Sequence, residues 1–127
     1  MFGLVNDVQA YPRRFSWCEG SSVVEVSEGI VVARLDLRVA GLSLSLTTRN
    51  VLEPPTRIAL QLEDGPFSKF KGLWFFHSLA EDACKVSLTL EFEVASKLIG
   101  SAMAIGFQGL ADRMVDDFCR EADRNDD

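Results

Sequence analysis

Hydrophobic and polar residues alternate with a period of two along most of the chain between residues 22 and 93. In residues 31–39, for example, the odd positions are all aliphatic and most of the even positions are charged. This alternation is typical of antiparallel strands that bury one face and expose the other. Short segments, several of them containing glycine or proline, separate the runs. The pattern predicts an antiparallel meander of six strands, at residues 22–26, 31–39, 42–47, 58–63, 70–76 and 84–93.

After Ala95 the spacing of apolar residues changes to that of an amphipathic helix. Ser96 is the predicted N-cap, and a helix that reaches Asp123 would be about 40 Å long and would span the sheet. Gly106 and Gly109 lie in its middle, and each glycine lowers the stability of a helix by about 1 kcal/mol relative to alanine. The two glycines indicate either that the helix backbone lies close to another element or to a ligand, or that the helix tolerates a locally less stable turn. The apolar face of this helix would carry Ile99, Met103, Gly106, Phe107, Leu110, Met114 and Phe118.

The N-terminal residues predict two short helices ahead of the sheet. Residues 1–8 are amphipathic, with Phe2 and Val5 on one side. Residues 7–15 form the second predicted helix, in which Pro12 is tolerated because it falls in the first turn. We therefore predict an α+β domain, in which a six-stranded antiparallel sheet turns its apolar face toward one long C-terminal helix.

Composition narrows the setting in which this domain works. Apolar residues make up 47% of the chain, but no run of about 18 of them is free of charge, so we expect no transmembrane helix. The first residues lack the features of a signal peptide. The three cysteines are Cys18, Cys84 and Cys119. They contain no CxxC pair, and an odd number of cysteines does not form a complete set of disulfide bonds. This suits a reducing cytoplasm and argues against a zinc site. We expect a cytoplasmic protein with no metal.

The net charge of −6 is concentrated at the end of the chain. Residues 110–127 hold seven acidic residues and three arginines, a balance of −4. We interpret this segment as a solvated helix face followed by a frayed tail. General acidity argues against nonspecific DNA binding, but it leaves room for a local basic contact with RNA.

Several short motifs occur in an order that resembles the coenzyme-Q-binding START-like family. That family includes the RatA ribosome-association toxins and proteins labelled oligoketide cyclase or lipid transport protein. The resemblance covers nearly the whole chain, and the shared order of the motifs makes it specific. They are Val5-Asn6-Asp7-Val8, Tyr11-Pro12, Trp17-Cys18, Thr47-Thr48-Arg49-Asn50, Gly65-Pro66-Phe67, Gly72-x-Trp74-x-Phe76 and Met114-Val115-Asp116-Asp117-Phe118.

The resemblance implies a START-like helix-grip fold over residues 1–127, with a curved sheet around the C-terminal helix and a cavity between them. It also implies a strand before the first helix, whereas this sequence begins at the helix. Either the start of the sequence was assigned too late, or the first family strand is absent and leaves an open edge that favours homo-oligomers. Residues 11–17 also depart from the family pattern, in which Phe-Leu-Pro often precedes the tryptophan.

The residue types needed for catalysis do not converge in this sequence. His77, the only histidine, shares the outward parity of Lys69 and Lys71, and Glu91 and Glu93 form a solvated pair. Tyr11, the only tyrosine, has a structural role in an early turn. No Gly-rich phosphate loop follows a strand, and no cluster has the spacing of metal ligands. We expect a protein that is not an enzyme, without cyclase activity and without a required cofactor.

The inward face is instead suited to a hydrophobic ligand. A wholly apolar concavity fits an isoprenoid or quinone tail, although each of its residues is also explained as plain core. Phe67, after Gly65-Pro66, is either a lip over the opening or an ordinary turn residue. The predicted cavity residues are Leu35, Leu37, Leu44, Leu46, Leu60, Trp74, Phe76, Leu88, Leu90, Met103, Phe107 and Met114.

Cations on the polar faces of the strands form a second candidate site. Arg49, Lys69 and Lys71 all have outward parity, and they are either a patch for lipid headgroups or ribosomal RNA, or scattered solvated charges. Whether they converge depends on strand order, which the sequence leaves open.

We therefore predict noncatalytic binding of ubiquinone or a similar isoprenoid lipid, in support of respiratory electron transport. Such a protein would be cytoplasmic and could be peripheral to the inner membrane. The resemblance implies an alternative, a RatA-like toxin that binds the large ribosomal subunit and blocks 70S assembly. The two activities are compatible with each other.

Overall fold

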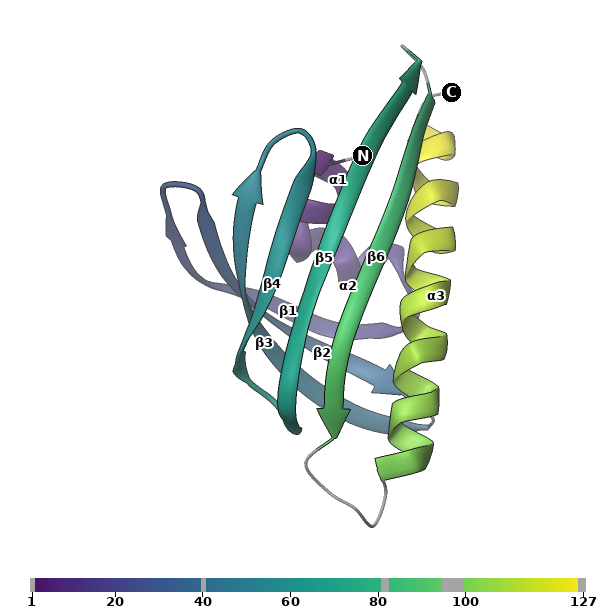
Figure 1. The fold of residues 1–127 in the computed structure, drawn as a ribbon. Helices are drawn as coiled ribbons and strands as arrows, with labels where there is room; N and C mark the ends of the chain where they lie inside the picture. The colour runs from purple at the N-terminus through teal and green to yellow at the C-terminus, as the bar shows by residue number, and fades with distance from the viewer. Residues whose placement is uncertain (1, 40, 81–82, 95–99, 126–127) are drawn as a thin grey trace.

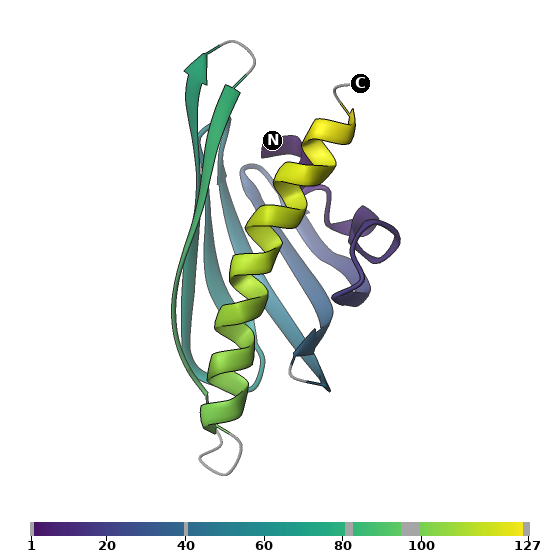
Figure 2. The same cartoon turned by 90° about the vertical axis from the view of Figure 1, so that its right-hand side faces the viewer.

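The computed structural model describes residues 2–39, 41–80, 83–94 and 100–125. A curved antiparallel sheet wraps around one long helix, α3 (Gly100–Asn125), which crosses its concave face (Figures 1 and 2). Each strand pairs with the next one in sequence, so the strand order is β1-β2-β3-β4-β5-β6. The predicted α+β helix-grip fold is confirmed. The strands are β1 (Cys18–Ser27), β2 (Ile30–Val39), β3 (Leu42–Glu53), β4 (Arg57–Asp64), β5 (Phe67–Ala80) and β6 (Ala83–Val94).

The strands are longer than the alternation predicted, and β3 shows why. The predicted strand ended at Thr47, because four polar residues in a row interrupt the apolar pattern. In the structure β3 continues to Glu53, pairing with both β2 and β4. Thr48 and Asn50 keep the inward parity of Leu46 and are buried, so the period of two persists while the residue type changes.

The N-terminal segment is more broken than predicted. It consists of α1 (Phe2–Asn6), a 3-10 turn η1 (Val8–Ala10) and α2 (Tyr11–Arg14). The side chain of Asp7 makes no capping hydrogen bond, and the helical path changes on either side of it. The Tyr11 hydroxyl donates a hydrogen bond to the carbonyl of Val5. This bond ties α2 back to α1, so the two pieces cover the concave side as one layer.

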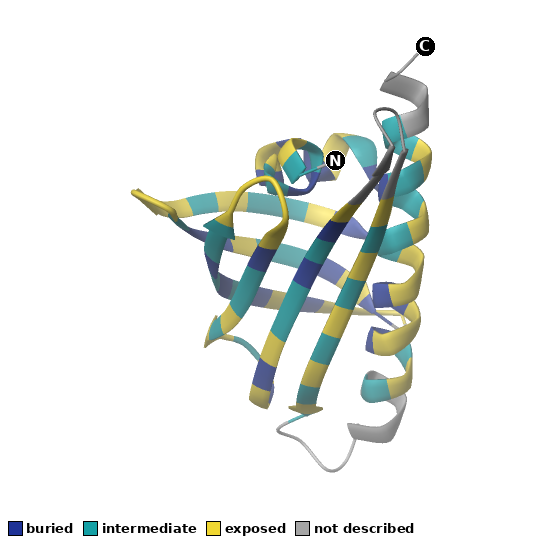
Figure 3. Ribbon diagram, turned by 45° about the horizontal axis from the view of Figure 1, so that its top comes forward, coloured by how far each residue is buried: buried dark blue, intermediate teal, exposed yellow. Residues whose placement is uncertain are grey.

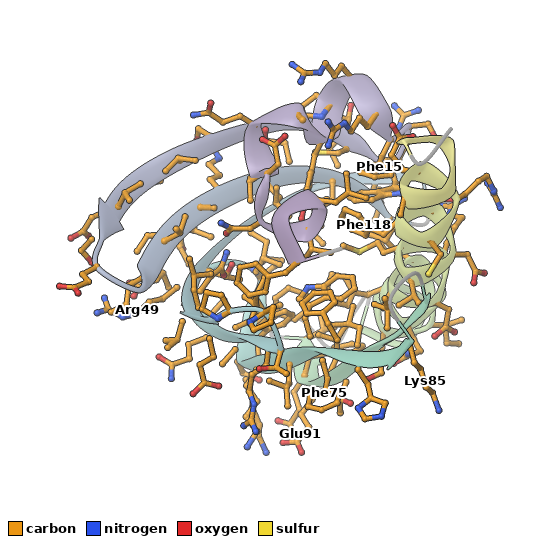
Figure 4. All side chains as sticks on the ribbon, turned by 90° about the horizontal axis from the view of Figure 1, so that it is seen from above. Phe15, Arg49, Phe75, Lys85, Glu91 and Phe118 are labelled. Carbon is orange, nitrogen blue, oxygen red and sulfur yellow. The ribbon has the colours of Figure 1, made fainter. Side chains whose placement is uncertain are left out.

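Aromatic residues hold the C-terminal half of α3 against this layer. Phe118 is fully buried and its ring contacts Phe15 at 4.7 Å and Trp74 at 5.4 Å between centroids. Figure 4 shows Phe15 and Phe118 meeting between α2 and α3. Trp17 stacks on Phe15 and donates a hydrogen bond from Nε1 to Asp117 Oδ2 at 2.9 Å. This half of the helix is therefore fixed by both packing and a directed polar contact.

A second aromatic cluster holds the other half of α3. Phe107 contacts Phe67, Phe70 and Phe92, at centroid distances between 5.0 and 5.9 Å. Along β6, half-buried and exposed residues alternate (Figure 3). The predicted N-cap, Ser96, lies outside the described residues. The two clusters lie at either end of the space between the helix and the sheet, and that space contains the candidate site.

β1 and β6 form the two edges of the described sheet. α3 packs beside β6, as Figure 1 shows. Val24 and Val26 on β1 are among the most exposed aliphatic side chains of the described residues, at 62% and 69%. No helix in the described part of the chain is both long enough and apolar enough to cross a bilayer.

Candidate functional site

A cavity of about 60 Å³ lies between the concave face of the sheet and α3. It is narrow, because large side chains from both layers meet across it, and it has room for a few water molecules. Its wall draws on α1, η1, α2, all the strands from β2 to β6, and α3. The lining residues are Val5, Asn6, Val8, Tyr11, Ala33, Leu35, Leu37, Leu46, Thr48, Asn50, Ile58, Leu60, Phe70, Trp74, Leu88, Leu90, Phe107 and Met114.

Most of the predicted cavity residues lie in this wall, and two described ones do not. Phe76 is buried beside Trp74, where it stacks against that ring and contacts Phe2. Leu44 is buried further along β3, beside a shallow surface hollow bounded by the β2–β3 and β4–β5 turns. Met103 belongs to α3, but its side chain lies outside the described residues. The predicted residues in the wall are Leu35, Leu37, Leu46, Leu60, Trp74, Leu88, Leu90, Phe107 and Met114.

Phe67 does not form a lip over the cavity. It is 6% exposed and packs edge-on against Phe92 and Phe107 beneath the helix. The pairing of β5 with β6 shifts register between Phe67 and Lys69, so Phe67 packs against Phe70 although the two are three residues apart. The preceding turn also passes close to the core, since a Cβ at Gly65 would lie 3.1 Å from the side chain of Leu46.

The expectation of a wholly apolar concavity is wrong. Thr48 and Asn50 are only 8% and 7% exposed, and both line the cavity. The Thr48 hydroxyl donates a hydrogen bond to Asn50 Oδ1 at 2.7 Å. Asn6, from α1, also lines the cavity, and its Oδ1 has no hydrogen-bond partner among the described residues. Sequence reasoning assigned this part of β3 to family membership, although its inward parity was the available signal.

The sheet residues Ala33, Ile58 and Phe70 and several residues of the N-terminal layer also line the cavity, although they were not among the predicted cavity residues. Val5, Val8 and Tyr11 close one side of the cavity. Burial raises the pKa of Tyr11 far above its usual range, so its hydroxyl stays protonated and bonded to the Val5 carbonyl. Tyr11 is also the one titratable side chain among the lining residues that the structure describes. The wall thus carries hydrogen-bonding groups without a charge.

The outward cations do converge on one region, and acidic residues are interleaved with them. Gln61 pairs with both Arg49 and Lys71, which places those two cations in one row across the outer face. Arg49 lies 4.0 Å from a carboxylate oxygen of Glu63, and Lys71 lies 3.6 Å from one of Glu91. Lys69 is the register partner of Glu93. Figure 4 shows Arg49 and Glu91 pointing away from the interior.

His77 and the outward glutamates do not reach the cavity. His77 is exposed and stacks on Phe75 at a centroid distance of 6.2 Å, on the outer face of β5. Figure 4 shows Phe75 and Lys85 on that same outward side. The described residues hold no group of three His, Cys, Asp or Glu side chains with the geometry to bind a metal ion.

Comparison with known families gives a match over almost the entire chain. Residues 1–119 match the family described as polyketide cyclase / dehydrase and lipid transport. The chain is 49% identical over 122 residues to the ribosome association toxin RatA of Vibrio cholerae, which covers 96% of this chain and 85% of that protein. It is 43% identical to RatA of Pseudomonas aeruginosa, with the same coverage. A persistence and stress-resistance toxin, PasT of Escherichia coli, is also 43% identical, over 93% of this chain and 75% of that protein.

Solved structures agree with this assignment at the level of the fold. The ZhuI aromatase/cyclase from Streptomyces sp. R1128 superposes with a TM-score of 0.86 at 22% identity, over 99% of this chain and 86% of that one. A START superfamily protein from Mycobacterium smegmatis superposes with a TM-score of 0.67 at 21% identity, over 89% and 88%. The chain therefore belongs to the polyketide cyclase / dehydrase and lipid transport family, as a RatA-like member with the START helix-grip fold.

Proposed function

We propose that this protein is a noncatalytic binder of a hydrophobic ligand, and that the ligand is an isoprenoid quinone such as ubiquinone. The observation that supports this most strongly is the cavity, whose wall consists of aliphatic and aromatic side chains with a few uncharged polar groups. Binding sites for small apolar molecules have this composition. A quinone combines a long apolar tail with a ring whose polar atoms are uncharged carbonyl and ether oxygens, which matches both parts of the wall.

A noncatalytic role is supported by the chemistry that the wall offers. General acid–base catalysis needs a group that exchanges a proton near neutral pH within reach of the ligand. Tyr11, the one titratable side chain among the described lining residues, is held protonated by burial and its pKa lies far above that range. The other lining side chains would contact the ligand and set the shape of the cavity, but they do not exchange protons. No metal or cofactor is required for such a role.

The cavity must expand to accept a quinone, because a volume of about 60 Å³ holds only a few waters. Leucine, phenylalanine and methionine side chains from the sheet and from α3 fill the remaining space. Met114 is unbranched and adapts its shape readily. We therefore expect ligand entry to displace side chains of the wall, and the N-terminal half of α3 to move more than the half fixed by Trp17 and Phe118.

The experiment is to purify the protein from a quinone-containing bacterium, extract it with organic solvent, and analyse the extract by mass spectrometry. Titration with decylubiquinone, followed by tryptophan fluorescence, gives the affinity, because Trp74 lies in the cavity wall. We expect a stoichiometric quinone in the extract and saturable quenching. An extract without lipid, together with no change in fluorescence, would overturn the proposal.

A second candidate function is association with the large ribosomal subunit, which would block formation of 70S ribosomes. It is supported by the relatives named ribosome association toxin, which are up to 49% identical over 96% of this chain. Under this proposal the protein acts in the cytoplasm. Sucrose gradients after overexpression test it: we expect fewer 70S particles and more free subunits, with the protein in the large-subunit fraction. An unchanged 70S peak would exclude it.

A further inference from the structure

Two buried polar side chains line the cavity, and the hydrogen bond between them uses only part of their hydrogen-bonding capacity. Thr48 and Asn50 are neighbours on the inward face of β3, and each is more than nine-tenths buried. Their one mutual hydrogen bond runs from the Thr48 hydroxyl to Asn50 Oδ1. This is the one hydrogen bond that the Asn50 side chain makes among the described residues, and its amide nitrogen is not one of the fully enclosed polar atoms that lack a partner. Because Asn50 lines the cavity, this nitrogen is a donor that a ligand or a water in the cavity can use.

The unmet donor does not depend on how the Asn50 amide is oriented. If the amide is turned by 180°, its nitrogen donates to the Thr48 oxygen instead. The Thr48 hydroxyl hydrogen then has no partner in its place. In either orientation the pair presents at least one free donor to the cavity. The Thr48–Asn50 pair is therefore a hydrogen-bond donor site in a wall that is otherwise mainly apolar.

The surroundings of the pair decide which ligand group it fits. A charged carboxylate or phosphate would need a cation beside it, because burying an unpaired charge is far more costly than burying a neutral polar group. Among the described residues that line the cavity there is no lysine, arginine or histidine. The nearest cation along the strand, Arg49, has outward parity and is 4.0 Å from Glu63. A fatty acid or phospholipid head is thus disfavoured, and a neutral carbonyl oxygen is favoured.

We propose that Thr48 and Asn50 form the head-group subsite of the cavity, and that they donate a hydrogen bond to a carbonyl oxygen of a neutral lipid. This proposal rests on the proposed ligand-binding function and specifies the class of ligand. Asn6 Oδ1, which also lines the cavity and has no partner among the described residues, offers an acceptor for a hydroxyl group or a water. The leucines and aromatics of the wall then enclose the tail.

The test compares two ligands with the same tail, decylubiquinone and decylbenzene, in the wild type and in Asn50→Leu. One lost hydrogen bond lowers affinity by about three- to tenfold. We expect that loss for decylubiquinone and no loss for decylbenzene, which has no acceptor. Gln61→Leu makes a matched amide-to-leucine change on the outer face of β4 and should leave both affinities unchanged. Thr48→Val serves as a second variant if Asn50→Leu fails to fold.

Infrared spectra of bound quinone provide an independent readout. A carbonyl that accepts a hydrogen bond absorbs at lower frequency, so we expect the shift in the wild type and its loss in Asn50→Leu. Equal weakening of both ligands, or an unshifted carbonyl band in the wild type, would overturn the subsite. If decylbenzene binds and Asn50→Leu changes nothing, the subsite fails while the cavity function stands. If neither ligand binds the wild type, the proposed function fails as well.

Discussion

Trp17 connects the segment before β1 to the C-terminal half of α3 through one hydrogen bond, from Nε1 to Asp117 at 2.9 Å. Because the acceptor is a partly buried carboxylate, we expect Trp17→Phe to lower the free energy of unfolding by about 1.5–3 kcal/mol. Urea denaturation measures this. In a double-mutant cycle, Asp117→Ala should cost clearly less in the Trp17→Phe background than in the wild type. Additive costs would show that the bond contributes nothing.

Cys18 makes stability depend on pH. Burial is the main reason that the pKa of this thiol is raised to about 11, and the nearby Asp36 and Glu19 carboxylates add to it. In the unfolded chain the pKa of a cysteine thiol is about 8.5. Because the folded pKa is the higher one, the contribution of the neutral thiol is complete below pH 8.5 or so and declines as the pH rises toward 11.

We therefore expect the free energy of unfolding to fall between pH 8 and pH 10.5 or so, and to fall less steeply in Cys18→Ala. Urea denaturation of both proteins at several pH values measures the two slopes. Tyr11 is present in both proteins, so its contribution cancels in the comparison. Equal slopes would contradict the assignment to Cys18.

At the residue scale, the sequence predicted which face of a strand each residue occupies better than it predicted which polar residues line the cavity. Alternation correctly placed Leu35, Leu46 and Leu60 on the inward face, because it depends only on the geometry of an extended chain. The same parity includes Thr48 and Asn50, but polar residue types masked it. The contributions of Val5 and Tyr11 could not be predicted, since they depend on how the N-terminal layer folds over the sheet.

At the scale of single elements, two glycines differ in whether neighbouring side chains leave room for a Cβ atom. Gly72 lies in β5, where an added Cβ would stand 2.7 Å from Leu90 Cδ2 and 3.1 Å from Leu60 Cδ1. Gly109 lies in α3 with nothing within 4 Å of such a Cβ. Of the two interpretations left open for the helix glycines, the tolerated, locally less stable turn therefore applies to Gly109.

The same substitution should have opposite effects at these two positions. We expect Gly72→Ala to destabilise the protein by about 1–3 kcal/mol, because Leu60 and Leu90 must shift toward the cavity. Gly109→Ala should stabilise it by up to about 1 kcal/mol through helix propensity. Thermal and urea denaturation of both variants provide the comparison. A stabilising Gly72→Ala would mean that the inward face of β5 is not tightly packed.

Element boundaries were the least predictable feature at this scale. The number of strands followed from alternation and short links, whereas the strand order, which the sequence left open, comes from the structure, in which each strand pairs with the next one in sequence. The true ends of β3 and β5 depend on pairing with adjacent strands, and pairing extends regular structure through residues whose own pattern is weak. For the same reason Phe67 belongs to β5 and to the core, where the sequence left open a turn or a lip.

At the scale of the whole molecule, a sheet that curves around α3 leaves a cavity of about 60 Å³ between the two layers. Its existence was implied by the family resemblance, but its size and its polar groups depend on sheet curvature and side-chain packing, which the sequence does not specify. The central claim is that a hydrophobic ligand binds in this space. Ala33, 2% exposed on β2, is the smallest side chain in its wall.

The most direct test of that claim is to fill the cavity from this position. We expect Ala33→Leu to abolish saturable binding of decylubiquinone, because the added atoms occupy the space that the ligand needs. Ala59→Leu is the matched control: Ala59 alternates with the cavity-lining Ile58 and Leu60 and so faces outward from β4. It should bind like the wild type. Retention of wild-type affinity in a folded Ala33→Leu protein would contradict the account.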